Sequence, residues 1–202
     1  MLDLIVLTHP DSDHITGLVP VLERYQVDMI IFREMDVTSE VYDYWLQLLG
    51  TEGATVYQGE AGLRLMLDEG LEMIVLHPGT RLLEDANNNS IVTLLTYGQV
   101  SVLLPGDIEA EVEHRLVAEG VPLESTVLKA AHHGSCSSTT QEFLDAVNPE
   151  VVVISVGADN RFGHPCAEVL ERLERLPVYR TDEQGVVEII SDGAQVWVET
   201  GR

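Results

Sequence analysis

The chain has 202 residues, of which 45% are hydrophobic and 22% are charged, so its composition is that of a globular protein and excludes global disorder. No apolar run reaches the ~18–20 residues that a membrane-spanning helix needs, and two cysteines are too few for a disulfide framework. The formal net charge of −23 excludes a general electrostatic surface for nucleic acid or anionic membranes. This acidity indicates either a solvated surface or sites where bound divalent cations supply positive charge.

Short apolar strands and amphipathic helices alternate at the start of the chain. The apolar run Leu2–Thr8 predicts a buried strand, and apolar residues at helical spacing predict a helix over Ile15–Tyr25. A strand at Met29–Phe32 and a helix at Ser39–Leu49 follow, and Gly50 is expected just past the end of that helix.

The rest of the chain predicts strands in quick succession and then strands separated by helices. The predicted strands are Thr55–Tyr57, Leu63–Leu67, Leu71–Leu76, Ile91–Tyr97, Val100–Leu104, Thr126–Lys129, Val151–Val156, Val178–Arg180, Val186–Ile190 and Gln195–Glu199. The predicted helices are Ile108–Ala118, Thr140–Val147 and Ala167–Leu176. Such a pattern indicates an α/β fold in which helices cover the outer faces of sheets.

Four potential metal ligands lie in the loop after the first strand, namely His9, Asp11, Asp13 and His14. The carboxyl end of a strand is where α/β proteins commonly bind ligands, and imidazole and carboxylate groups in one loop suit a divalent metal. The alternative is a polar turn in which Asp13 caps the helix that follows.

Three later loops also follow predicted strands and carry groups of the same kind. Asp107, taken alone, is either the N-cap of the next helix or a ligand. The single lysine, Lys129, precedes the adjacent pair His132 and His133. The side chains of adjacent residues diverge, so one of this pair is expected to bind metal directly. The last loop contains His164, and we expect all these loops to converge with the first one on a single pocket.

Two further histidines do not follow this pattern. His114 lies among charged residues of a predicted helix and is expected at the surface. His77 precedes Pro78 and is expected to end a strand.

The loop from His9 to His14 resembles the His-x-His-x-Asp-His signature of the metallo-β-lactamase superfamily, with Asp11 where the second histidine usually stands. A closer match is the metallo-β-lactamase-like domain of the ComEC competence proteins, which take up DNA, and it spans nearly the whole chain. The segments that carry this resemblance are His9–His14, Asn87–Ser90, Leu104–Glu109, Leu128–Ser135 and Ser155–Pro165.

The sequence departs from that domain in two places. The domain usually opens with strands that carry a Gly-Gln-Gly-Asp segment and an Asp-x-Gly turn, and neither is present here. Asn87 and Asn88 stand where the superfamily has a third metal-binding histidine. The resemblance therefore implies a four-layer αββα sandwich in which residues 1–202 form one domain that lacks its N-terminal strands.

The resemblance also implies two divalent ions, Zn²⁺ or Mn²⁺, and a role for each candidate. His9 and Asp11 are expected to hold one ion and Asp13, His14 and His132 the other, with Asp107 bridging the two. The expected catalytic groups are Asp13, Lys129, His133 and His164, which would contact phosphate oxygens or protonate the leaving oxygen. For Lys129 the alternative is an ion pair with a ligand carboxylate.

The function implied is metal-dependent hydrolysis of phosphodiesters, with single-stranded DNA as the substrate during DNA uptake. A lactonase or phosphorylcholine esterase on the same fold is one alternative, and a non-catalytic docking domain of an uptake complex is the other. The resemblance implies a membrane-channel domain as partner and a place on the extracytoplasmic face of the cell membrane, without membrane insertion of this chain itself. In that compartment Cys136 and Cys166 can form a disulfide, and neither is expected to be catalytic because acidic surroundings raise the pKa of a thiol.

Overall fold

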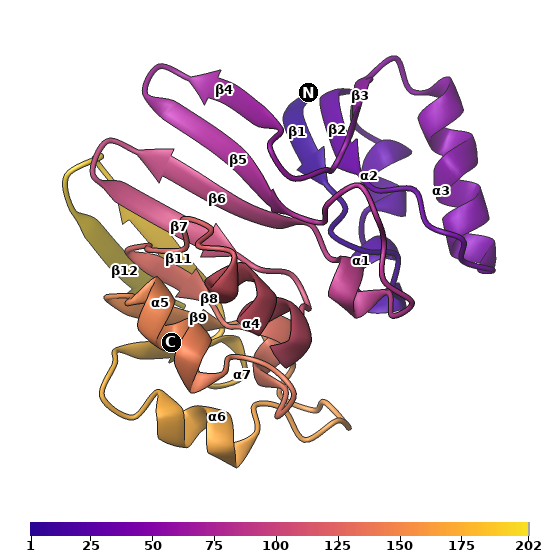
Figure 1. Ribbon diagram of the computed structural model, residues 1–202. Coiled ribbons are helices and arrows are strands. Elements are labelled where there is room, and N and C mark those ends of the chain that lie inside the picture. Colours follow the sequence, from indigo (N-terminus) through magenta and orange to yellow (C-terminus); the bar gives the residue numbers. More distant parts are fainter. Residues whose placement is uncertain (202) are drawn as a thin grey trace.

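The computed structural model describes residues 1–201. Its strands form a three-stranded sheet A, a seven-stranded sheet B and a separate hairpin (Figure 1). The strands are β1 (Leu2–Val6), β2 (Val27–Phe32), β3 (Thr55–Gln58), β4 (Arg64–Asp68), β5 (Leu71–His77), β6 (Val92–Tyr97), β7 (Val100–Leu104), β8 (Val127–Lys129), β9 (Val151–Ile154), β10 (Val178–Arg180), β11 (Val187–Ser191) and β12 (Val196–Thr200). The helices are α1 (Ser12–Ile15), α2 (Val19–Leu22), α3 (Glu40–Thr51), α4 (Ala110–Ala118), α5 (Gln141–Val147), α6 (Ala167–Arg172) and α7 (Thr181–Gln184), with short 3₁₀ turns η1 (Asn87–Asn89) and η2 (Ala131–Gly134).

Sheet A is parallel, in the order β1-β2-β3, and α1, α2 and α3 lie on its outer side (Figure 1). Side chains alternate across a strand, so Ile30 and Phe32 of β2 face these helices and pack with the buried Trp45 of α3. The residue between them, Ile31, faces the opposite way, toward sheet B.

Sheet B has the order β10-β9-β8-β7-β6-β5-β4. The strands β4 to β7 form an antiparallel meander, and β7 to β10 run parallel, with α4, α5 and α6 in the connections. Leu103 of β7 and Leu128 of β8 are fully buried against the apolar side of these helices, including Phe143 of α5.

The two sheets pack face to face through a third cluster. Met73 and Val75 of β5 meet Ile31 of sheet A, whereas Leu76 of the same strand points to the helices of sheet B. The layers are therefore helix, sheet, sheet, helix. This arrangement confirms the αββα sandwich that the resemblance implied. Among residues 1–201, no helix combines the length and apolar character that crossing a membrane requires.

Each predicted strand has a counterpart among β1 to β12, and the main differences concern the helices. The helix predicted over Ala167–Leu176 ends at Arg172. The helix predicted over Ile15–Tyr25 is wrong, because α1 and α2 are two short helices. Pro20 lacks the N–H that would continue one helix through this stretch. Gly50 lies inside α3 rather than past its end, since the N–H of Glu52 still donates to the carbonyl of Leu48. The short helix α7 was not predicted.

Candidate metal centre

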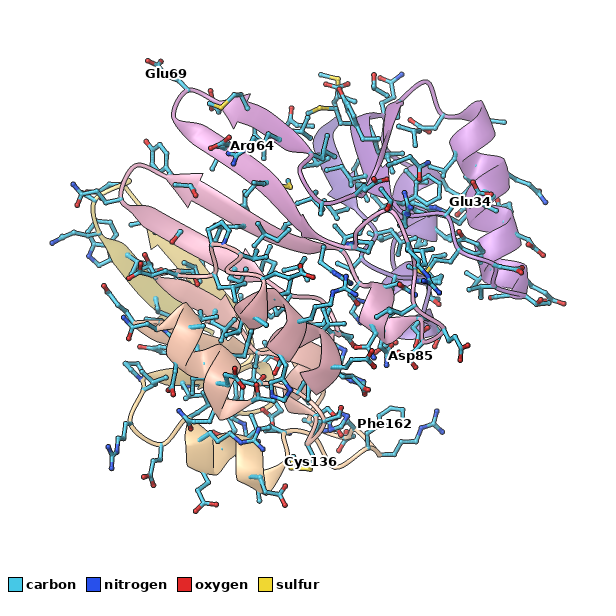
Figure 2. The ribbon with its side chains drawn as sticks, in the orientation of Figure 1. Glu34, Arg64, Glu69, Asp85, Cys136 and Phe162 are labelled. Carbon is cyan, nitrogen blue, oxygen red and sulfur yellow. A yellow bond between two sulfur atoms is a disulfide. The ribbon has the colours of Figure 1, made fainter. Side chains whose placement is uncertain are left out.

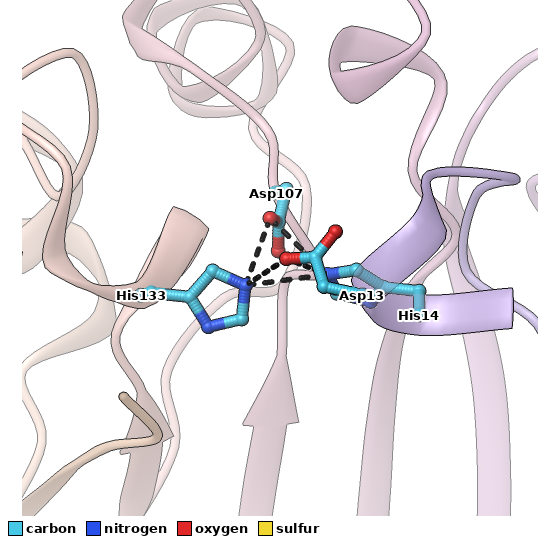
Figure 3. Close-up of side chains that lie close together, drawn as sticks. All are labelled: Asp13, His14, Asp107 and His133. Carbon is cyan, nitrogen blue, oxygen red and sulfur yellow. Dashed lines mark hydrogen bonds and ion pairs between the residues drawn. The ribbon is translucent and has the colours of Figure 1, made fainter. Parts of the chain in front are cut away.

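Three loops that follow strands bring four metal-type side chains together (Figure 3). Asp13 and His14 lie in α1, which follows β1, and Asp107 follows β7. His133 lies in η2, which follows β8. Because β7 and β8 are parallel neighbours, their carboxyl ends lie side by side, and the facing sheet A brings the α1 loop to the same point. The loops thus converge as the sequence predicted.

The atoms of these four side chains are spaced like the ligands of one cation. The Nε2 atoms of His14 and His133 are 3.3 Å apart, and each lies 3.3 Å from Asp107 Oδ2. Asp13 Oδ2 is 3.2 Å from His133 Nε2 and 3.8 Å from His14 Nε2. In a tetrahedral site with metal–ligand distances of about 2.0–2.1 Å, neighbouring ligand atoms lie roughly 3.3–3.4 Å apart. The four side chains therefore fit a divalent ion at their centre.

Asp107 is held by the turn that precedes it and does not cap a helix. The N-cap of α4 is Glu109, so the capping alternative does not describe Asp107. Gly106 has a φ of +61°, and a Cβ there would stand 2.7 Å from the Cβ of Ser90. The Asp107 N–H donates to the Ser90 hydroxyl at 3.0 Å. Glycine at 106 thus permits the close approach that aims the Asp107 carboxylate at the histidines.

Of the adjacent histidines, the structure places His133 rather than His132 in the group of four. Both have left-handed backbone angles, with φ of 48° and 54°, a conformation that costs of order 1–3 kcal/mol and is concentrated at functional sites. Their rings diverge, with centroids 6.4 Å apart. His132 Nδ1 instead lies 3.6 Å from a carboxylate oxygen of Glu109.

The proton of neutral His133 is fixed by its second hydrogen bond. Nδ1 donates to the carbonyl of Ser155 at 2.7 Å, and a carbonyl can only accept. A neutral ring therefore carries its proton on Nδ1 and turns the Nε2 lone pair toward Asp13 and Asp107. Metal-binding histidines typically have such an outer hydrogen bond.

The electrostatics favour an ionised Asp107. Burial by itself would raise the pKa of this carboxyl. In the absence of metal, hydrogen bonds from protonated His133 and His14 and the nearby charge of Lys129 hold the pKa far below its usual range. Lys129 Nζ lies 3.9 Å from Asp107 Oδ1. Burial lowers the pKa of Lys129, while the charges of Asp107 and Asp13 counteract that effect. Asp107 is thus a permanent negative charge at the centre of the cluster.

His9 lies beside the group of four and ends in an unpartnered nitrogen. Its ring centroid is 4.1 Å from that of His14. Nδ1 lies 3.1 Å from the Thr8 hydroxyl and 3.2 Å from the Ser90 hydroxyl. Burial, and next the charge of His14, lower the pKa of His9 to about 4, so the ring is neutral near pH 7.

Three buried polar atoms at this place have no hydrogen-bond partner, namely His9 Nε2, Asp107 Oδ1 and His132 Nδ1. Leaving a buried polar atom unpaired costs about 1–3 kcal/mol, and bound cations would satisfy the lone pairs of His9 Nε2 and Asp107 Oδ1. The residues present therefore fit a divalent metal.

Besides His9, Lys129 and His132, the predicted site residues Asp11 and His164 also lie outside the group of four. Asp11 is the N-cap of α1 and its side chain is exposed; burial of its carboxyl, and then the charge of Asp13, raise its pKa. The rings of His164 and His132 meet edge to face, with centroids 5.7 Å apart. Burial and then the charges of His132 and His133 lower the pKa of His164.

The remaining histidines are placed as predicted. His77 ends β5, is buried and donates from Nε2 to the Asn88 carbonyl at 2.8 Å. His114 is half exposed and lies 3.7 Å from Glu142.

Asn88, which stands with Asn87 where the superfamily has a third metal-binding histidine, supports the loop together with its neighbour Asn89. The Asn88 side-chain oxygen accepts from the N–H of Glu109. Asn89 bonds to the backbone of Leu83 and Asp85. Sequence reasoning had assigned no role to Asn89, Ser90 or Ser155. The motifs contain these residues, but their hydrogen bonds depend on tertiary contacts.

Cys136 and Cys166 form a disulfide. It ties the segment after His133 to the start of α6, just past His164. The N–H of Cys166 also donates to the Gly134 carbonyl. The pairing that the resemblance allowed is thus present, at the edge of the candidate metal centre.

Comparison with known proteins identifies relatives of the chain and of the fold. Residues 1–158 match the family model described as the metallo-beta-lactamase superfamily. The chain is 33% identical over 189 residues to ComE operon protein 3 of Bacillus subtilis, covering 93% of this chain and 24% of that protein. It is 33% identical over 190 residues to competence protein ComA of Neisseria gonorrhoeae, covering 93% of this chain and 25% of the relative. The chain thus spans about a quarter of the length of these two relatives.

A solved structure shares the fold at low identity. CmlA, a diiron β-hydroxylase from Streptomyces venezuelae, superimposes with a TM-score of 0.59 at 16% identity, covering 88% of this chain and 43% of CmlA.

Proposed function

The chain belongs to the metallo-β-lactamase superfamily, and we propose that it is a metal-dependent phosphodiesterase that hydrolyses single-stranded DNA during competence-related DNA uptake. The single observation that carries the proposal is the group Asp13, His14, Asp107 and His133, whose ligand atoms have the spacing of a cation site. The names of the relatives, which are competence proteins, support DNA as the substrate.

A divalent ion held by these four residues would polarise a phosphoryl oxygen and lower the pKa of water toward neutrality. We assign His9, whose buried Nε2 has no hydrogen-bond partner, to a second ion, and Asp107 would contribute its carboxylate to both sites. Zn²⁺ and Mn²⁺ both suit histidine and carboxylate ligands.

The other candidate residues handle the substrate. Lys129 is a cation beside Asp107, and we assign it to a phosphate oxygen, where it stabilises developing negative charge. His164 lines the same cavity as Asp13 and His133. Its lowered pKa keeps the ring neutral near pH 7, so its role is to donate a hydrogen bond to the phosphate.

The parent context is also part of this proposal. We assign the chain to a ComEC-type protein whose membrane-channel domain is its partner, at the extracytoplasmic face of the membrane. The Cys136–Cys166 disulfide supports that compartment, because disulfides persist in oxidising environments.

The test is release of nucleotides from a labelled single-stranded oligonucleotide, with Mn²⁺ or Zn²⁺ and with a chelator. Asp107→Ala is expected to abolish the reaction, because the four-ligand group loses its buried carboxylate. Lys129→Ala is expected to lower the rate by about 10²–10³. Asp43→Ala, an exposed carboxylate on α3, is the control and should act like the wild type. Metal-loaded protein that binds the strand without cleaving it would favour a docking domain instead.

A further inference from the structure

A cavity of about 440 Å³ extends from the metal ligands to an exposed loop. It is lined by Asp13 and His133 of the metal centre and by Phe162 and His164 of that loop. A substrate bound in this cavity against the metal ligands therefore lies close to the Phe162 side chain.

The loop that carries Phe162 is held in one shape by a single asparagine. The Asn160 amide donates to the carbonyls of Gly157 and His164 at 2.9 and 2.8 Å. Its side-chain oxygen accepts from the N–H groups of His164 and Phe162 at 3.0 and 3.3 Å. The ring of Phe162 is thus presented by an ordered turn.

The ring itself is left open to solvent. Phe162 is 72% exposed, and Figure 2 shows it at the outer edge of the molecule. It lies nearly parallel to the His164 ring, with centroids 5.9 Å apart and planes at 16°. The Arg161 guanidinium stands 5.8 Å from its centroid, near the outer limit of a cation–π contact. An isolated exposed aromatic residue needs no explanation. Phe162 differs because it lies on an ordered loop, is nearly parallel to a neighbouring ring and lines the cavity at the metal ligands.

We propose, on the basis of the function proposed above, that Phe162 stacks on the nucleobase next to the scissile phosphate and that Arg161 pairs with the adjacent phosphate. Base stacking on exposed aromatic rings is one way in which proteins hold single strands without reading sequence. The chain has only 11 basic residues against 34 acidic ones. Arg161 is one of the few, and its guanidinium beside the Phe162 ring offers a positive charge to a phosphate. The substrate class is therefore a phosphodiester that carries bases, rather than a lipid headgroup or a base-free diester.

The hydrolysis test compares two small substrates with Mn²⁺ present. One is the dinucleotide thymidylyl-thymidine, and the other is the same diester with tetrahydrofuran residues in place of both nucleosides. Phe162→Ala is expected to lower kcat/KM for the dinucleotide by about tenfold to a hundredfold and to leave the base-free diester unchanged. Phe162→Trp should retain the discrimination. Tyr25→Ala, which removes an exposed ring outside this cavity, is the matched control.

A binding measurement makes the outcome independent of catalysis. A dinucleotide that contains 2-aminopurine loses fluorescence when its base stacks, so quenching is expected with wild-type protein and Phe162→Trp, and much less with Phe162→Ala. Equal quenching by wild type and Phe162→Ala, or an equal loss of kcat/KM for both diesters in Phe162→Ala, would overturn the stacking role. Quenching without hydrolysis of either diester would support stacking and count against the phosphodiesterase proposal.

Discussion

The choice between two adjacent histidines decides the chemistry of this site. In the sequence His132 and His133 are equivalent, and His132 was the one assigned to the metal. The structure gives His133 the contacts to Asp107 and Asp13 and turns His132 toward Glu109. Both residues have left-handed backbone angles, and their rings diverge to centroids 6.4 Å apart, so only one ring reaches the Asp107 carboxylate.

This difference leads to a prediction about metal affinity. His133→Ala is expected to weaken Mn²⁺ or Zn²⁺ binding by more than the 10–100-fold typical of an outer-shell substitution, because a ligand is lost. His132→Ala should bind the metal with little change. Isothermal titration calorimetry on both variants measures the effect, and circular dichroism checks that each is folded. The reverse order of affinities would assign the ligand to His132.

His77 permits a test of stability against pH away from the metal ligands. Burial lowers the pKa of this ring, and its hydrogen bond to Asn88 offsets part of the effect. The unfolded chain, with a histidine pKa near ~6.5, therefore binds a proton more readily than the folded chain does. His77 therefore stabilises the folded chain at pH values above ~6.5. This stabilisation is lost as the pH falls toward the lower pKa that His77 has in the folded chain.

In urea unfolding with chelator present, the free energy of unfolding of the wild type should fall between about pH 7.5 and about pH 5. His77→Gln should show a smaller fall over the same range. The exposed His114→Gln should follow the wild type. If His77→Gln and the wild type have equal pH dependence, then His77 does not contribute to it.

At the level of elements, the disulfide connects two loops that border the metal centre. Gly134, with a φ of +81°, lies so close to Pro165 that a Cβ would stand 2.7 Å from the Pro165 Cβ. Cys136 and Cys166 reinforce this contact across a sequence separation of 30 residues. The disulfide and the Gly134–Pro165 contact hold the turn η2, which contains His132 and His133, against the segment that precedes α6.

Removing the cross-link is expected to lower the free energy of unfolding by ~3–4 kcal/mol, since it frees a loop of this length in the unfolded chain. Urea unfolding of the Cys136→Ser/Cys166→Ser variant measures this. A reducing agent should destabilise the wild type similarly and leave the double variant unaffected. Two reactive thiols in denatured, unreduced wild type would contradict the disulfide.

Across the whole molecule, the net charge of −23 opposes the approach of a polyanion. Repulsion between like charges is screened by salt. We therefore expect KM for a long single strand to fall as monovalent salt rises from about 20 to about 200 mM at fixed excess Mn²⁺. The KM for a dinucleotide, which carries little charge, should change far less. A KM that rises steeply with salt would instead show counterion release from a dedicated cationic surface.

The sequence by itself determined the order of strands and helices, because apolar periodicity is a local property that each segment carries with it. It also indicated that Asp13, His14 and Asp107 belong together, since each follows an apolar strand and such strand ends meet at one edge. Only the tertiary structure decided the pairing of Cys136 with Cys166 and the inward turn of His133. Those features depend on backbone angles and contacts that packing between distant segments imposes, so no local pattern records them.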